Sequence, residues 1–221
     1  MRRVIRAGFV SMLLAMVGML SSAAHAADAT ALAVEGTDYT LLSPAQPTSN
    51  PKKIVVSEFF SYHCSHCYAF HPYVTSWARK LPGDVVFERV PVSLGRAAWQ
   101  PVSQAFYALQ AMGKLEQLDT LIFSAIHTQK TTLYDEASMT RFVVKQGVNA
   151  AEFTAAYNSF GVKSSLASAE LKMKSHKVSG TPALVINGKY IVIAEGTRGY
   201  ADLLARADRV IAKVRAEQVR K

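Results

Sequence analysis

Cysteine is scarce in this chain of 221 residues, which contains only two, Cys64 and Cys67. Two cysteines cannot form a framework of several disulfides, nor supply all the thiolates of a zinc site made of cysteines alone. A zinc site would need two further ligands, and His63 and His71 could complete a set of two cysteines and two histidines. A structural disulfide between positions 64 and 67 would close too small a loop to constrain the unfolded chain much. The spacing therefore favours thiol–disulfide exchange, with a metal site and an inert disulfide as alternatives.

The sequence also lacks a phosphate-binding loop, a nucleic-acid-binding motif and an internal repeat. Its formal net charge is +9, and the basic residues are spread along the chain, with the highest density after Arg206. Such a charge can favour anionic membrane surfaces, but it identifies no partner. Beyond the N-terminal segment, no apolar run reaches the ~20 residues that a membrane-spanning helix needs. We therefore expect no nucleic-acid ligand.

The N-terminus has the pattern of a secretory signal peptide. Arg2, Arg3 and Arg6 precede an apolar run at residues 7–20, and Ala24-His25-Ala26 fits the small-x-small pattern of a cleavage site. We expect export and cleavage after Ala26, which removes residues 1–26 and lowers the formal charge from +9 to +6 because three arginines are lost. A retained membrane anchor is the alternative, but the apolar run is short for a spanning helix. The export route, Sec or Tat, stays open.

The motif Cys64-Ser65-His66-Cys67 lies between an apolar, strand-like run at residues 54–60 and a helix-like segment. Unpaired N–H groups and the helix dipole stabilise an anion at a helix N-terminus, so Cys64 should ionise easily. Cys64 is therefore the expected nucleophile, or the sulfur attacked by a substrate thiolate, and Cys67 the resolving cysteine. His66 can add a hydrogen-bond donor or a positive charge. Together these features predict a redox-active dithiol.

The coarse pattern of the chain predicts an α/β fold. We expect strands at residues 38–42, 54–60, 85–92, 182–186 and 189–193, with helical patterns after the cysteines, through the middle and at 199–217. Asn187-Gly188 is typical of a type I′ hairpin turn. The β segments flank an all-helical stretch, which predicts one sheet built from both ends of the chain. We therefore divide it into a domain of residues 27–93 and 177–221 and an inserted helical domain of residues 94–176.

Within the insertion, Asn149 and Glu152 resemble a capping box that opens a helix. Phe153, Tyr157 and Phe160 continue with helical spacing, and Gly161 is predicted to end the helix. The apolar stripes of this region indicate a packed core rather than a cofactor site.

Three segments of the sequence are informative in combination: Glu58-Phe59-Phe60-Ser61, the following residues 62–68 around the cysteines, and Gly180-Thr181-Pro182 after the helical insertion. Together they resemble the DsbA thiol:disulfide oxidoreductases of the bacterial periplasm. The resemblance implies a thioredoxin fold with a helical-domain insertion and donation of the Cys64–Cys67 disulfide to newly exported proteins. One departure is the dipeptide Ser65-His66, where the best-known members have Pro-His. Because that dipeptide tunes the redox potential within the fold, the resemblance does not fix the redox potential of this protein.

The resemblance also implies roles for individual residues. Pro182 is expected to be cis and to face the cysteines, where the backbone of Thr181 can pair with an extended substrate alongside Ser65. Glu58 is expected to be buried, with a raised pKa, and to tune or transfer protons for Cys67. The alternative is a carboxylate at a sheet edge or on the surface. Arg89, in the next strand, could pair with it.

We therefore expect a periplasmic dithiol oxidase without a bound cofactor or metal. Its expected partners are unfolded exported polypeptides with free cysteines and, by family likeness alone, a membrane quinone reductase of the DsbB type. A disulfide isomerase or reductase on the same fold is the nearest alternative, but residues 27–38 contain no candidate dimerisation segment, so a monomer is expected. A metal-binding protein that uses Cys64, Cys67 and a histidine is the alternative of another class.

Overall fold

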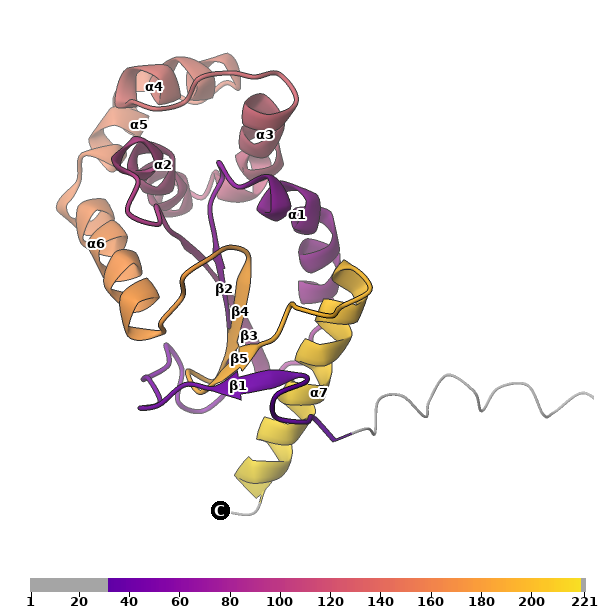
Figure 1. Cartoon of the computed structure of the whole chain (residues 1–221). Helices are drawn as coiled ribbons and strands as arrows, with labels where there is room; N and C mark the ends of the chain where they lie inside the picture. The colour runs from indigo at the N-terminus through magenta and orange to yellow at the C-terminus, as the bar shows by residue number, and fades with distance from the viewer. Residues whose placement is uncertain (1–31, 220–221) are drawn as a thin grey trace, which may run out of the picture. The chain divides into compact units, whose positions relative to one another are not determined.

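The computed structural model describes residues 32–219, so the predicted signal peptide lies outside the described residues. A five-stranded mixed sheet lies at the centre (Figure 1). Its strands are β1 (Tyr39–Leu41), β2 (Ile54–Phe60), β3 (Val85–Pro91), β4 (Ala183–Ile186) and β5 (Tyr190–Val192). The strand order is β1-β5-β4-β2-β3, with β2 and β3 parallel and the other neighbours antiparallel. The two ends of the described chain thus build one sheet, as predicted.

Strand β2 is the most buried strand, and all seven of its residues are buried. It pairs with β3 on one side and β4 on the other, and helices cover both of its faces. A strand in this position is expected to be a continuous apolar run, and Ile54–Phe60 is one except for Ser57 and Glu58. The central strand therefore carries a buried carboxylate directly before the segment that holds the cysteines.

Helices pack on both faces of the sheet (Figure 1). Helices α1 (Ser65–Ala78) and α7 (Tyr200–Val219) cover one face, where Phe70 and Val74 of α1 share a core with Val210 of α7. On the other face, Ala169 and Met173 pack against Phe59. This sandwich fixes α1, and with it the cysteine motif, against the sheet.

All of the remaining helices follow one another between β3 and β4. They are the 3₁₀ turn η2 (Ala97–Trp99), α2 (Gln100–Ala111), α3 (Leu115–His127), α4 (Glu136–Lys145), α5 (Ala150–Tyr157) and α6 (Phe160–Ser175). Their apolar side chains form a core that also contains Phe60, Tyr62 and Cys67. The inserted helices therefore pack directly against the end of β2 and the buried cysteine. Their status as a separate domain of residues 94–176 stays a prediction.

The predicted end of the helix that starts after Asn149 is wrong. Asn149 does cap α5, but α5 ends at Tyr157, and a new helix, α6, begins at Phe160. The hydroxyl of Ser159 accepts a hydrogen bond from the N–H of Val162 at 3.3 Å, which caps the new helix. Gly161 therefore lies in the first turn of α6 rather than at the end of α5.

The predicted hairpin turn is confirmed. Asn187 and Gly188 have φ values of 53° and 61°, as a type I′ turn requires, and the N–H of Lys189 donates to Ile186 O at 3.1 Å. A Cβ at position 188 would lie 2.1 Å from Gln46 O, so glycine is needed there for space as well. No helix within residues 32–219 is long and apolar enough to cross a membrane.

Candidate active site

The two cysteines lie at the N-terminus of α1 in different surroundings. Cys64 is the N-cap of the helix, with extended backbone angles, and its Sγ accepts a hydrogen bond from the N–H of Cys67 at 3.3 Å. A sulfur thus occupies the place where a serine or aspartate oxygen usually accepts this bond. Cys64 is partly exposed, whereas Cys67 is buried in the core shared with the inserted helices. Both are free thiols, so the geometry is that of the reduced protein.

These surroundings separate the acidities of the two thiols. Hydrogen bonding from the Cys67 side chain, helped by the backbone of Cys67 and His66, lowers the pKa of Cys64 to about 5, although burial opposes the shift. Burial raises the pKa of Cys67 well above that of an ordinary thiol, and the neighbouring Cys64 sulfur raises it further. The reduced site therefore holds one thiolate and one thiol at neutral pH.

Thr181 and Pro182 lie beside Cys64, although they are far away in the sequence. Thr181 O lies 3.3 Å from Cys64 Sγ and accepts a hydrogen bond from it when Cys64 is protonated, and the peptide bond between Thr181 and Pro182 is cis, as the resemblance implies. The hydroxyl oxygen of Thr181 is buried and has no hydrogen-bond partner among residues 32–219. The contact brings the loop before β4 to the reactive sulfur.

Ser65 and His66 occupy the first turn of α1, and both side chains are exposed. The carbonyl of His66 accepts a hydrogen bond from the hydroxyl of Tyr200 at 3.2 Å. This hydrogen bond connects the first turn of α1 with the start of α7. The side chains of Ser65 and His66 are therefore open to an approaching molecule.

Glu58 is buried, and its side chain is 1% exposed. It lies opposite Arg89 in the parallel register of β2 and β3, and Arg89 Nε donates to Glu58 Oε2 at 2.8 Å. The surface or sheet-edge alternative is therefore wrong, and the pairing with Arg89 is found. Burial raises the pKa of Glu58, and the positive charge of Arg89 only partly opposes this shift.

Asp119 of α3 joins this ion pair, and the sequence analysis missed it. Its Oδ2 accepts from Arg89 Nη1 at 2.5 Å, and its Oδ1 accepts from the hydroxyl of Tyr62, also at 2.5 Å. His71 Nε2 lies 3.5 Å from the same carboxylate. Asp119 and its partners are dispersed over the sequence, and no motif connects them. The only signal was an acidic residue next to Leu118 in an apolar helical stripe.

His63 and His71, the two histidines that could have completed a zinc site, pack against neighbouring side chains. The ring of His63 stacks with Trp99 and Tyr134, at centroid distances of 5.6 and 4.7 Å, and burial lowers the pKa of His63 to about 4. His71 is hydrogen-bonded to hydroxyls on α1 and α3. Within residues 32–219, no three His, Cys, Asp or Glu side chains form a group that could hold a metal ion. The structure therefore does not assemble the set of two cysteines and two histidines.

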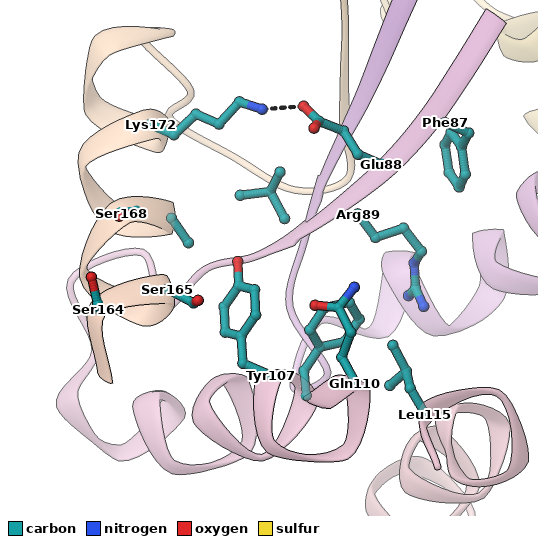
Figure 2. Close-up of a pocket in the computed structure, with 13 residues that line it drawn as sticks. Phe87, Glu88, Arg89, Tyr107, Gln110, Leu115, Ser164, Ser165, Ser168 and Lys172 are labelled. Carbon is teal, nitrogen blue, oxygen red and sulfur yellow. Dashed lines mark hydrogen bonds and ion pairs between the residues drawn. The ribbon is translucent and has the colours of Figure 1, made fainter. Parts of the chain in front are cut away.

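A pocket of about 570 Å³ lies away from the cysteines, between β3, α2 and α6 (Figure 2). Glu88 and Lys172 form an ion pair across it, while the side chain of Arg89 leaves β3 in a different direction (Figure 2). Neither cysteine lines this pocket. The reactive sulfur instead lies on a surface formed by the helix α1 and the Thr181-Pro182 loop.

Comparisons with known proteins agree with this geometry. Residues 55–205, more than half of the chain, match the family model described as a DSBA-like thioredoxin domain. The thiol:disulfide interchange protein DsbA of Pseudomonas aeruginosa is 38% identical over 92% of this chain and 94% of its own length. The protein of the same name from Bordetella pertussis is 35% identical over 80% of this chain and 84% of its own length.

Solved structures give the same result. The crystal structure of Pseudomonas aeruginosa DsbA matches with a TM-score of 0.78 and 37% identity, over 83% of this chain and 95% of that one. DsbA from Xylella fastidiosa matches with a TM-score of 0.77 and 28% identity, over 84% of this chain and 100% of that one. The fold is therefore the thioredoxin-like fold predicted from the sequence. The chain belongs to the DsbA family of thiol:disulfide oxidoreductases.

Proposed function

We propose that this protein is an exported dithiol oxidase that donates a Cys64–Cys67 disulfide to newly exported polypeptides. The observation that carries the proposal is the unequal pair of sulfurs, with a thiolate favoured at Cys64, where the pKa is about 5, and a thiol favoured at the buried Cys67. Stabilising the thiolate stabilises the reduced form, so the disulfide becomes a stronger oxidant. One pKa unit corresponds to about 30 mV for this two-electron couple.

The first step forms a mixed disulfide. A substrate thiolate attacks Cys64 Sγ, a bond forms between the two sulfurs, and the Cys64–Cys67 bond breaks with its electron pair on Cys67. Cys67 leaves as a thiolate in a buried site that favours the thiol, so it takes up a proton. Glu58 is the proposed source of this proton, because it is buried in the strand that leads to the motif and its pKa is raised.

The second step releases the product. A second substrate thiolate attacks the substrate sulfur of the mixed disulfide, and Cys64 leaves as the thiolate that its surroundings stabilise. The substrate loses two electrons and gains a disulfide, while the protein gains the same two electrons as a thiolate and a thiol. The two sulfurs supply the redox chemistry, so the proposed reaction uses no bound cofactor or metal.

The proposed substrates are unfolded exported polypeptides with free cysteines. An extended chain can pair with the backbone of Thr181, whose carbonyl lies 3.3 Å from Cys64 Sγ, and pass Pro182 and the exposed Ser65. His66 would lie beside the reacting sulfurs. We place the protein in the periplasm as a monomer, reoxidised by a membrane quinone reductase of the DsbB type.

The equilibrium of the dithiol with glutathione tests the oxidase proposal. We expect a potential above about −180 mV, the value of a protein disulfide isomerase. The Cys67→Ser variant, which cannot form the internal disulfide, supplies the baseline. A potential below about −230 mV would instead assign a reductase role. Metal content after purification, with thiol counts before and after chelation, separates the metal-binding alternative: bound metal that masks both thiols would contradict the proposal.

A further inference from the structure

A buried cluster of charged groups connects the central strand with the inserted helices. The guanidinium of Arg89 lies between two carboxylates, with Nε donating to Glu58 at 2.8 Å and Nη1 donating to Asp119 at 2.5 Å. Its third nitrogen, Nη2, is buried without a hydrogen-bond partner in the described part of the chain. The guanidinium also lies over the ring of Phe60, 3.9 Å from its centroid. One positive charge is therefore divided between two buried negative groups.

The two carboxylates are not equally supplied with donors. Asp119 accepts from Arg89 and from the hydroxyl of Tyr62, and His71 Nε2 lies 3.5 Å from it. Among residues 32–219, the Glu58 carboxylate has one hydrogen-bond partner, Arg89, and its side chain is 1% exposed, against 13% for Asp119. Hydrogen bonds to a carboxylate favour its charged form, and burial disfavours it. By these contacts, the negative charge of Glu58 is less stabilised than that of Asp119.

Other titratable groups near Glu58 do not change this order. Arg89 comes from β3, Asp119 from α3, Tyr62 from the loop after β2, and His71 from α1. Burial favours the neutral form of Tyr62 and lowers the pKa of His71. The Glu88–Lys172 pair is on the opposite face of the sheet, because neighbouring residues of a strand point to opposite faces. Figure 2 shows Glu88 and Arg89 extending in different directions from β3.

We propose that Asp119 is a positioning residue that holds one arm of Arg89 and thereby leaves Glu58 able to carry a proton for the redox reaction. Without the charge of Asp119, the positive charge of Arg89 would stabilise the Glu58 carboxylate alone and keep it ionised. The functional meaning rests on the proposed oxidase mechanism, in which Glu58 supplies the proton that the leaving Cys67 sulfur requires. The Asp119 carboxylate thus acts on the reaction through Arg89 and Glu58, without contact with the sulfurs.

The Asp119→Asn variant tests this role, because the amide keeps the shape and one oxygen acceptor but removes the charge. The titration of the Glu58 carboxyl carbon is followed by NMR in the reduced protein and assigned by its loss in Glu58→Gln. We expect the midpoint to fall by about 1–2 pH units in Asp119→Asn. Asp84→Asn, which removes a carboxylate paired with Arg215 on an exposed surface, is the matched control and should leave the midpoint unchanged.

A merely structural role for Asp119 would leave the midpoint of Glu58 unchanged in a folded variant, and that result would overturn the proposal. A higher midpoint would overturn it as well. Near-ultraviolet circular dichroism checks that each variant is folded. If Asp119→Asn does not fold, Asp119→Ser provides the test. It also removes the negative charge beside Arg89, so the Glu58 midpoint should again fall.

A kinetic readout connects the titration with the reaction. In single-turnover oxidation of a peptide dithiol, the rate of the first step in Asp119→Asn should decline at a lower pH than in the parent, following the Glu58 midpoint. If the Glu58 midpoint changes in Asp119→Asn but the pH dependence of the rate does not, the link between Asp119 and the reaction is overturned. The glutathione equilibrium of the parent reports separately on the oxidase function, so failure of that function and failure of the Asp119 proposal are distinguishable.

Discussion

Cys64 and Cys67 are separated by two residues, yet the helix gives them opposite properties. Cys64 caps the helix and receives an N–H donor, whereas Cys67 lies one turn further on, where it is 1% exposed. A thiolate needs donors and solvent, and a thiol needs neither. The division of labour between nucleophile and resolving cysteine therefore follows from one turn of helix.

Thiolate titration of two single variants tests this assignment. In Cys67→Ser, the serine hydroxyl can still donate to Cys64, so we expect an acidic transition near the parent value of about 5. In Cys64→Ser, Cys67 stays buried, and no thiolate should form below about pH 8. The ultraviolet absorbance of the thiolate, recorded against pH, measures both. An acidic transition that survives the loss of Cys64 would contradict the assignment.

The redox motif could be predicted from the sequence, but its supporting cluster could not. Cys64, Cys67 and Glu58 stand within ten positions of one another, and the strand and helix patterns place them. Asp119 and Tyr62 are 57 positions apart, and their contact exists only because α3 packs against the loop after β2. Apolar spacing predicts which face of a helix is buried, but it does not predict which polar side chain at the edge of that face meets a partner.

Helix α6 shows why element boundaries are harder to predict than elements. Phe160 continues the spacing of Phe153 and Tyr157, which predicts a single helix, yet Phe160 is 88% exposed. The boundary is set by Ser159, whose hydroxyl caps a new helix. A capping hydrogen bond of this kind competes with continuation of the previous helix, and the apolar pattern does not record it.

Substitution of Ser159 measures the contribution of this cap. Ser159→Ala removes the acceptor for the N–H of Val162, so we expect the free energy of unfolding to fall by about 1 kcal/mol. Ser164→Ala changes an exposed serine inside the same helix and should leave stability within about 0.5 kcal/mol of the parent. Urea denaturation of the reduced proteins compares them. Equal stability of Ser159→Ala and the parent would show that other contacts fix the start of α6.

At the scale of the whole molecule, the site depends on closure of the sheet from both ends of the chain. Strand β2 pairs with β3 and with β4, and the loop before β4 brings Thr181 to Cys64 across 117 positions of sequence. The alternation of β and helical segments predicted a single sheet with a helical insertion. It did not predict the strand order, because an antiparallel β4 can pair with either edge of the β2–β3 pair. The choice between the two edges depends on tertiary packing.

The acidity of Cys64 also predicts how redox state affects the stability of the whole fold. The pKa of Cys64 is lowered on folding to about 5, so its contribution to the reduced protein is full above the pKa of an unfolded thiol, about 8.5, and is lost as pH falls through 5. Cys67, whose pKa is raised, subtracts stability only above the pH at which an unfolded thiol ionises. The disulfide form has neither contribution, and its bridge closes a small loop that restricts the unfolded chain little.

We therefore expect the reduced protein to be harder to unfold than the oxidised protein at neutral pH, with a difference that grows from pH 5 to pH 8. Urea titrations of both forms at pH 5, 7 and 8 measure it. The Cys64→Ser variant, which lacks the acidic thiol and cannot form the disulfide, should lack the gain in stability between pH 5 and pH 8 that distinguishes the reduced parent from the oxidised parent. The usual effect of a disulfide has the opposite sign, since a cross-link destabilises the unfolded state. An oxidised form of equal or greater stability at pH 7 would mean that folding does not favour the Cys64 thiolate enough to make the disulfide a strong oxidant, and a reductase or structural role would then fit better.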